Sequence, residues 1–192
     1  MIAYDWVVLA SWAAFLFVWI ALAFDVKPDV DRAGAWRRAW RVGIVALAFV
    51  LVHARLVAFG GAVRTDATQL FVPPLWLGWA GAACAVAGVG VAIWARLHLG
   101  RNWSSRPTMK QGHELVTTGP YRFVRHPIYT GVLLAALGAF CLGNLFSVGV
   151  AIVIAILFLL RIPKEEAIMR GLFPEAYPAY QARTKRLIPF VW

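Results

Sequence analysis

Residues 128–160 read IYTGVLLAALGAFCLGNLFSVGVAIVIAILFLL, and these 33 residues carry no formal charge. A single helix of this length would be about 50 Å long, whereas the hydrocarbon layer of a bilayer is roughly 30 Å thick. Gly143 and Asn144, near the centre, form a pair that is typical of turns. We therefore expect a tight hairpin of two membrane helices, each close to the minimum length for spanning.

Three further apolar stretches precede this hairpin: Ile2–Phe24, Val42–Phe59 and Leu75–Ala95. The whole chain is 61% hydrophobic and 15% charged, whereas a soluble domain is about half apolar and a quarter charged. The sequence therefore predicts an all-α integral membrane protein with about five transmembrane helices. We expect a single membrane domain over residues 1–192, with three N-terminal helices in 1–95 and a functional core in 96–192.

The basic residues predict how this domain is oriented. Of the 19 Lys and Arg residues, 17 lie in the segments 25–41, 96–127 and 161–192. With five spans these segments share one face, which the positive-inside rule places in the cytoplasm. The N-terminus is then outside and the C-terminal tail cytoplasmic. The net charge of +10 accordingly indicates contact with anionic lipid head groups rather than with nucleic acid.

The predicted spans contain few polar groups. His53 and Arg55 lie at membrane depth, where Arg55 either serves a function or extends to the outer interface. So few polar residues argue against a transporter or channel. Cys84 and Cys141 lack CxxC spacing and are expected to pack as small hydrophobic side chains. Small residues recur along the third stretch, a pattern typical of closely packed helices. They are Gly81, Ala85, Gly88 and Ala92.

Most of the side chains capable of chemistry lie in the connection 96–127, which holds three of the four histidines. Proline cannot donate a backbone hydrogen bond and favours the first position of a helix, so a helix should begin at Pro127. His126 then lies at the helix entrance, where free N–H groups favour an anion such as a carboxylate. The spacing of the histidines, without HxxxH or HxH, argues against a metal site.

A second polar group follows the last apolar stretch, in the sequence RIPKEE of residues 161–166. Arg161 and Glu165 share a helix face at this spacing. Such a Glu can hold the amino group or ribose hydroxyls of a cofactor, and such an Arg can bind a substrate carboxylate. The alternative is an ordinary exposed ion pair that stabilises the helix by about 0.2–0.5 kcal/mol.

Five blocks then occur in order: HELV (113–116), GPYRFVRHPIYTG (119–131), R-x-x-x-E-E (161–166), FPEAYPAY (173–180) and RLIPFVW (186–192). Together they resemble the isoprenylcysteine carboxyl methyltransferase family, within a wider group that includes phospholipid N-methyltransferases. The resemblance covers roughly residues 96–192. It implies a membrane enzyme that uses S-adenosyl-L-methionine to methylate a lipid-like or prenylated acceptor.

The resemblance also implies a set of site residues. The cofactor site would be lined by His113, Glu114, Leu115, Val116, Tyr121, His126, Pro127, Tyr129 and Glu165. Arg161 would match the family's substrate-orienting arginine. The chain departs from the family pattern at Pro163, which could distort the helix that presents Arg161 and Glu165, and at Pro174, where a glycine is usual. Contacts from 101–111, including those of Arg106, Met109 or Gln111, stay open.

Methyl transfer requires the nucleophile, the methyl carbon and the sulfur to be collinear, and positioning can supply roughly 7–11 kcal/mol of the barrier. A carboxylate acceptor is already ionised at neutral pH, whereas an amine acceptor needs a general base. Two alternatives therefore remain beside carboxyl O-methylation. One is N-methylation of a phospholipid head group, and the other is a nicotinamide-dependent membrane lipid or sterol reductase.

Overall fold

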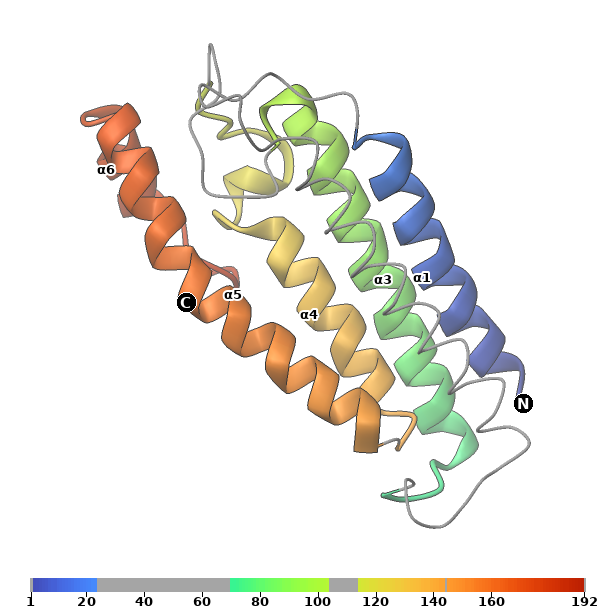
Figure 1. The fold of residues 1–192 in the computed structure, drawn as a ribbon. Helices are drawn as coiled ribbons and strands as arrows, with labels where there is room; N and C mark the ends of the chain where they lie inside the picture. Colours follow the sequence, from blue (N-terminus) through green and yellow to red (C-terminus); the bar gives the residue numbers. More distant parts are fainter. Residues whose placement is uncertain (1, 24–69, 104–113, 144, 192) are drawn as a thin grey trace.

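The computed structural model describes residues 2–23, 70–103, 114–143 and 145–191 (Figure 1). They form the helices α1 (Ala3–Ala21), α3 (Leu75–Leu99), α4 (Pro127–Phe140), α5 (Leu145–Leu172) and α6 (Ala176–Arg183), with 3₁₀ turns η2 (Gly100–Asn102) and η3 (Gly119–Arg122). Within these ranges there is no β-strand, only an isolated bridge between Val124 and Lys185. The predicted all-α class is confirmed.

Helix α3 lies between α1 and α4, and the three helices run side by side (Figure 1). The contact between α3 and α4 is backbone against backbone. A Cβ atom added to Gly88 would lie 2.4 Å from the carbonyl oxygen of Gly131, and one added to Gly81 would lie 2.7 Å from that of Gly138. The small-residue pattern of the third stretch therefore marks a close helix–helix interface, as predicted.

Helices α4 and α5 form the predicted hairpin, with the turn between Phe140 and Leu145. Gly143 has φ +74°, a left-handed conformation that glycine adopts without steric cost. The carbonyl oxygen of Gly143 accepts a hydrogen bond of 2.8 Å from the amide of Leu70. A Cβ atom on Gly143 would lie 2.2 Å from the carbonyl oxygen of Phe71, so this turn requires glycine for two separate reasons.

Helix α5 is continuous through Pro163. Proline removes one hydrogen bond from a helix interior, yet the pair that follows the proline keeps its geometry. The Nε atom of Arg161 lies 2.5 Å from Oε1 of Glu165. Pro163 therefore does not prevent α5 from presenting both residues on one face.

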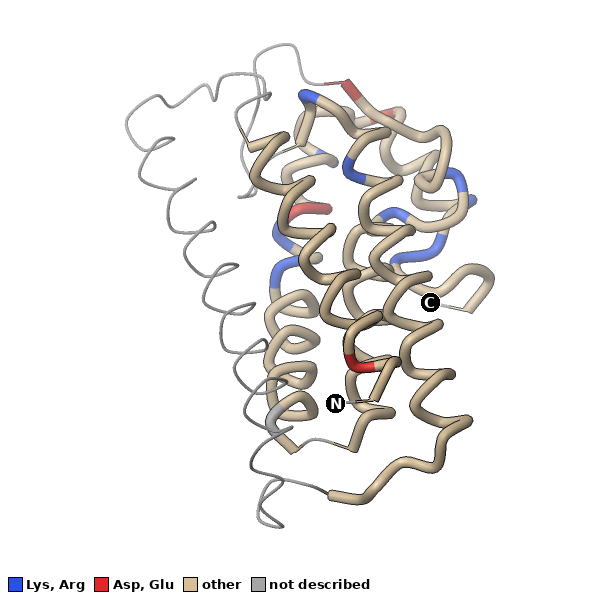
Figure 2. The backbone as a smooth tube through the Cα atoms, turned by 90° about the vertical axis from the view of Figure 1, so that its right-hand side faces the viewer, with Lys and Arg blue, Asp and Glu red and all other residues tan. Residues whose placement is uncertain are grey.

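Among the described residues, three helices are long and apolar enough to cross a membrane: Ala3–Ala21, Leu75–Asn102 and Ser147–Leu172. Helix α4 is a shorter apolar helix of 14 residues, equivalent to about 21 Å. The second predicted span, with His53 and Arg55, lies outside the described residues. Among the described residues, Lys and Arg gather at one end of the bundle (Figure 2). The chain is an integral membrane protein, and the Lys and Arg residues that the structure describes lie toward one end of the bundle.

Candidate active site

The candidate site lies where the start of α4 meets the C-terminal half of α5. Pro127 is the first residue of α4, as predicted, and His126 precedes it with φ −125° and ψ 59°. This non-helical backbone lets the His126 ring approach two carboxylates of α5. Its Nδ1 atom lies 3.5 Å from Glu165 Oε2, and its Nε2 atom lies 3.6 Å from Glu166 Oε1.

Glu165 binds two of the other predicted site residues. Its Oε1 atom accepts hydrogen bonds from the Tyr129 hydroxyl, at 2.7 Å, and from Arg161 Nε, at 2.5 Å. The side chain of Glu165 remains 22% exposed and that of Arg161 remains 32% exposed. Glu165 and Arg161 are therefore both fixed in position and accessible to a ligand.

Three aromatic rings form a stack beside this carboxylate. The rings of His126 and Tyr129 are 5.4 Å apart and 4° from parallel, and those of Tyr129 and Phe158 are 4.1 Å apart and 15° from parallel. Phe158 belongs to α5 and precedes Arg161 by one turn. The stack therefore links the entrance of α4 to the membrane part of α5, and it holds the Tyr129 hydroxyl against Glu165.

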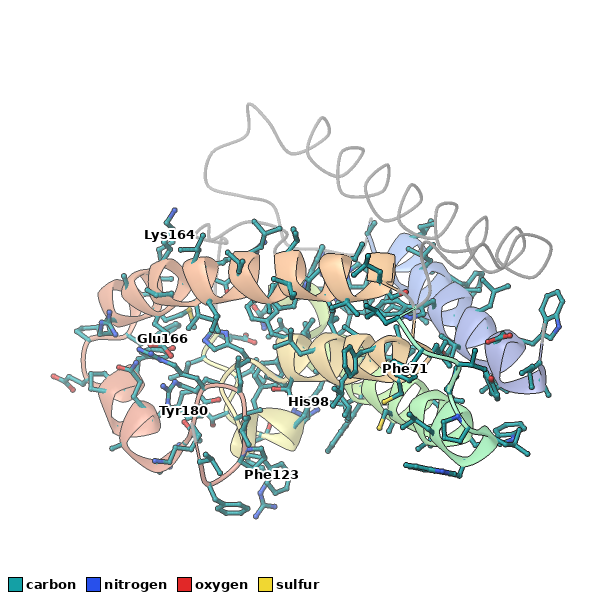
Figure 3. All side chains as sticks on the ribbon, turned by 90° about the horizontal axis from the view of Figure 1, so that it is seen from below. Phe71, His98, Phe123, Lys164, Glu166 and Tyr180 are labelled. Carbon is teal, nitrogen blue, oxygen red and sulfur yellow. The ribbon has the colours of Figure 1, made fainter. Side chains whose placement is uncertain are left out.

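Glu166, next in sequence, is 1% exposed and faces the other way, toward α6 (Figure 3). Its carboxylate accepts hydrogen bonds from Arg125 Nε at 2.8 Å, from Gln181 Nε2 at 3.2 Å and from an Nη atom of Arg186 at 3.3 Å. A buried carboxylate requires such partners to offset the loss of hydration. Glu166 therefore joins α5 to the segment before α4 and to the C-terminal tail.

Backbone hydrogen bonds also connect the C-terminal tail to the segment that precedes α4. The amides of Arg125 and His126 donate to the carbonyl oxygens of Lys185 and Arg186, at 2.8 and 3.0 Å. The Thr130 hydroxyl donates to the Leu187 carbonyl at 2.7 Å. The tail 185–187 therefore lies alongside residues 124–126 and holds His126 in place from the side opposite α5.

Two tyrosines support the turn η3 that leads into the site. The Tyr180 hydroxyl donates to the Tyr121 carbonyl at 2.6 Å, and the Tyr121 hydroxyl donates to the Ala95 carbonyl at 3.4 Å. Burial raises the pKa of Tyr180 to about 12 and also raises the pKa of Tyr121. Both phenols therefore stay protonated at neutral pH, and both link α6, η3 and α3 as hydrogen-bond donors.

Residues 114–117 have no regular secondary structure, and a contact between Glu114 and Asn102 places this segment beside η2. Asn102 is buried, and its Nδ2 atom lies 3.4 Å from Glu114 Oε2. Leu115 and Val116 are half-buried. Glu114 therefore lies near the C-terminal end of α3, whereas Glu165 lies on α5.

The pKa of His126 is raised above its ordinary value. Burial opposes the charged ring, but the carboxylates of Glu165 and Glu166 favour it, and their combined effect prevails. Nε2 of His126 is a buried atom without a hydrogen-bond partner among the described residues. The two carboxylates therefore favour the protonated ring, in which both nitrogen atoms carry a hydrogen that can be donated.

The structure thus brings four of the predicted site residues into direct contact: His126, Tyr129, Arg161 and Glu165. Pro127 sets the start of α4, while Tyr121 supports the neighbouring turn. Glu114, Leu115 and Val116 lie at the η2 side, where contacts to a cofactor remain a prediction. His113, Arg106, Met109 and Gln111 lie outside the described residues.

Sequence reasoning did not identify several residues that shape the site: Arg125, Phe158, Glu166, Gln181 and Arg186. The paired glutamates of the motif were the available signal for Glu166. Cys84 and Cys141 are free and half-buried in the apolar helices. In the part of the chain that the structure describes, no three His, Cys, Asp or Glu side chains are grouped as metal ligands would be.

Comparison with known proteins identifies relatives of this chain. A model of the isoprenylcysteine carboxyl methyltransferase (ICMT) family matches residues 81–171. Protein-S-isoprenylcysteine O-methyltransferase B of Arabidopsis thaliana is 27% identical over 182 residues, covering 91% of this chain and 92% of that protein. The cobalt-zinc-cadmium resistance protein CzcN of Cupriavidus metallidurans is 31% identical over 174 residues, covering 88% of this chain and 69% of that protein.

The fold has a solved relative as well. The eukaryotic intramembrane Ras methyltransferase ICMT matches with a TM-score of 0.55 and 21% sequence identity, over 94% of this chain and 75% of that one. The fold, the ordered motifs and the sequence matches agree with one another. The chain belongs to the isoprenylcysteine carboxyl methyltransferase family.

Proposed function

We propose that this protein is an S-adenosyl-L-methionine-dependent methyltransferase that methylates the carboxylate of a lipid-like or prenylated acceptor at the cytoplasmic membrane face. Family membership supports methyl transfer. The observation that carries the proposal is the contact of Arg161 with Glu165, at the point where α5 leaves its apolar part. This pair provides a cation for an acidic acceptor and a carboxylate for a cofactor.

The residues present suit this cofactor, which would supply an electrophilic methyl group. Its amino and hydroxyl groups need acceptors, and Oδ1 of Asn102, beside Glu114, is a buried atom without a hydrogen-bond partner among the described residues. Its carboxylate needs a donor, which Nε2 of His126 can provide. Glu165 is accessible enough to bind a hydroxyl or ammonium group. Tyr121, Pro127, Leu115 and Val116 would add apolar surface, and His113 completes the proposed set.

Arg161 is suited to orient the acceptor. Its Nε atom is occupied by Glu165, and within the described residues its two Nη atoms have no hydrogen-bond partner. A guanidinium edge with two N–H groups matches a carboxylate in a bidentate way. The acceptor oxygen is already ionised, so its alignment with the methyl group is the main requirement.

The alternative of an amine acceptor fits less well. N-methylation of a head group requires a base that removes a proton from nitrogen. His126 is one candidate, but the adjacent carboxylates raise its pKa and so favour the protonated ring, which is the form that cannot accept a proton. A carboxylate acceptor needs no base at all, and we therefore favour O-methylation.

The site is positioned to receive a water-soluble cofactor and a lipid-soluble acceptor together. The face of α5 below Arg161 exposes large apolar side chains, including Ile156, Leu157 and Leu160. An acyl or prenyl chain can approach along this face from the lipid, while the basic end in Figure 2 faces the aqueous phase. The positive-inside rule supports the cytoplasm as that phase.

The decisive experiment is methyl transfer by the purified protein in lipid nanodiscs, with isotope-labelled S-adenosylmethionine. We expect transfer to a prenylated cysteine with a free carboxylate and none to the matching carboxamide. In a parallel reaction, phosphatidylethanolamine is offered as an amine acceptor to test for N-methylation. Labelling of the lipid instead of the acid would support the N-methyltransferase. Absence of cofactor binding by titration calorimetry, in detergent and in nanodiscs alike, would refute the methyltransferase proposal.

Orientation has a test of its own. Single cysteines at position 115 and at the exposed position 182 should react with a membrane-impermeant reagent from the cytoplasmic side. A cysteine at position 72, which is exposed at the other end of the bundle, should react from the outside. Labelling of position 115 from the outer side would contradict the cytoplasmic location of the site.

A further inference from the structure

The segment Leu187–Val191 exposes more apolar surface than its length suggests. Leu187 is buried, but Ile188, Phe190 and Val191 expose 53%, 91% and 70% of their surfaces. Phe190 has φ +67° and is the only non-glycine residue with a positive φ among those described. L-residues seldom adopt this conformation, and here it accompanies a turn that leaves the ring clear of the protein. Apolar groups presented in this way indicate a contact with something outside the bundle.

The base of this segment is fixed to the candidate site. The Val124–Lys185 bridge and the hydrogen bond from the His126 amide to the Arg186 carbonyl hold the preceding residues. The Thr130 hydroxyl then binds the Leu187 carbonyl. The exposed residues Ile188, Phe190 and Val191 therefore follow a segment, 185–187, whose backbone is held by hydrogen bonds.

Basic side chains surround the segment. Arg183 and Lys185 are exposed directly before it. Because Val124 pairs with Lys185, the exposed residues Arg122 and Phe123 lie alongside this part of the tail. Phe123 is 46% exposed, and the Arg122 guanidinium lies 5.2 Å from the centre of its ring. The surface thus combines aromatic and aliphatic groups with three cations, as proteins do at the boundary between lipid and water.

The level of the segment in the bundle agrees with this composition. Figure 2 shows the chain near the C-terminus looping out beside the helices, next to the region where Lys and Arg gather. In Figure 1 the C-terminus lies at a lower level than α6, which occupies the tip of the basic end. The segment therefore projects sideways, at a level where head groups meet hydrocarbon.

We propose that Ile188, Phe190 and Val191, together with Phe123, insert into the boundary layer of an anionic bilayer, while Arg122, Arg183 and Lys185 bind lipid phosphates. The occupant is the lipid of the surrounding membrane. Charge complementarity selects anionic head groups, and burial in lipid offsets the exposure of the apolar side chains. Because residues 185–187 also bind the backbone of Arg125 and His126, the lipid contact restrains the candidate site as well.

The test measures the depth of a spin label at Val191→Cys in nanodiscs of phosphatidylcholine, with or without phosphatidylglycerol. Cys84→Ala and Cys141→Ala provide the background, and a label at the exposed Glu175→Cys is the aqueous reference. We expect the label at position 191 to be accessible to oxygen and protected from a water-soluble nickel chelate, more so with phosphatidylglycerol. Equal nickel accessibility at positions 191 and 175 would overturn the proposal and leave a protein partner as the occupant.

Two variants separate the apolar and the charged contributions. Phe190→Asp should return the label to water, and it should leave the fold intact because the ring makes few contacts. Arg122→Gln with Lys185→Gln should weaken retention of phosphatidylglycerol, measured by native mass spectrometry, about 30-fold, equivalent to about 2 kcal/mol. Lys164→Gln is the matched control, an exposed cation that points away from Glu166 and Tyr180 (Figure 3). An equal loss in the control would refute specific lipid binding by the tail.

Discussion

Glu165 and Glu166 are adjacent in sequence, yet their carboxylates serve different parts of the molecule. Glu165 faces Tyr129 and Arg161 and remains partly accessible. Glu166 is 1% exposed and binds Arg125, together with partners from the tail. A helix turns by about 100° between neighbours, so one residue can line a site while the next secures the structure around it.

Neutralising each glutamate should therefore have a different effect. Glu166→Gln leaves buried Arg125 without its anion, and we expect a loss of about 2–3 kcal/mol in the free energy of unfolding. Glu165→Gln should cost less than about 1 kcal/mol, but it should weaken S-adenosylmethionine binding at least tenfold, about 1.4 kcal/mol. Thermal unfolding and titration calorimetry in one detergent provide both measurements. The reverse pattern would exchange the roles assigned to the two residues.

Arg161 separates acceptor positioning from cofactor binding. Arg161→Ala should lower methyl transfer at least tenfold while cofactor affinity stays near that of the wild type. Arg161→Lys keeps the charge but lacks the planar pair of donors, so it should restore little activity. The measurements are the methyl-transfer rate and the S-adenosylmethionine affinity of both variants. If Arg161→Ala transfers methyl groups normally, the acceptor is held elsewhere and the exposed ion pair is only structural.

The α3–α4 interface predicts a sharp difference between two glycines of one helix. Gly88→Ala would place a methyl group 2.4 Å from backbone atoms of α4, so the helices must separate. We expect a loss of about 1–3 kcal/mol. Gly90→Ala meets nothing within 4 Å and should be neutral or slightly stabilising. Comparable destabilisation in both variants, measured by thermal unfolding, would contradict the packing described here.

The sequence predicted those features of the fold that depend on local pattern. The hairpin turn, the start of α4 at Pro127 and the Arg161–Glu165 pair all follow from residues close together in the chain, and the structure contains each of them. Pro163, which could have interrupted the helix, lies inside α5, and the helix continues to Leu172 although proline has no N–H to donate.

Long-range contacts could not be predicted in this way. Gln181 and Arg186 lie 15 and 20 residues from Glu166, and no periodicity indicates which carboxylate they bind. Phe158 looked like any other apolar residue of a membrane helix, and only the structure reveals that its ring stacks on Tyr129. The different roles of Glu165 and Glu166 therefore depend on tertiary contacts, which the local sequence pattern does not reveal.

The raised pKa of His126 predicts how stability depends on pH. Its folded-state pKa lies above the ordinary value of about 6.5, so the protonated ring stabilises the fold. This contribution is complete below about pH 6.5 and is lost as the pH rises through the folded-state pKa. The stability difference between the wild type and His126→Gln should therefore shrink as the pH rises, and a difference that grows would contradict the assignment.

Phe158 is the clearest case of a residue that acts through a neighbour. Its ring lies 4.1 Å from that of Tyr129, and the Tyr129 hydroxyl binds Glu165. Phe158→Leu keeps an apolar side chain of similar volume, so it should cost less than about 1.5 kcal/mol in stability. It removes the flat surface that orients Tyr129, however, so Glu165 loses a fixed partner.

We therefore expect Phe158→Leu to lower the methyl-transfer rate and cofactor affinity by severalfold, and Phe158→Tyr, which keeps the ring, to restore both. Tyr129→Phe should reproduce the loss, because it removes the same hydroxyl from Glu165. If the ring acts only through Tyr129, combining Phe158→Leu with Tyr129→Phe should add little to either single change, since residues in one network are not additive. Additive losses would instead show that Phe158 contributes to the site by an independent route, such as direct contact with the lipid chain of the acceptor.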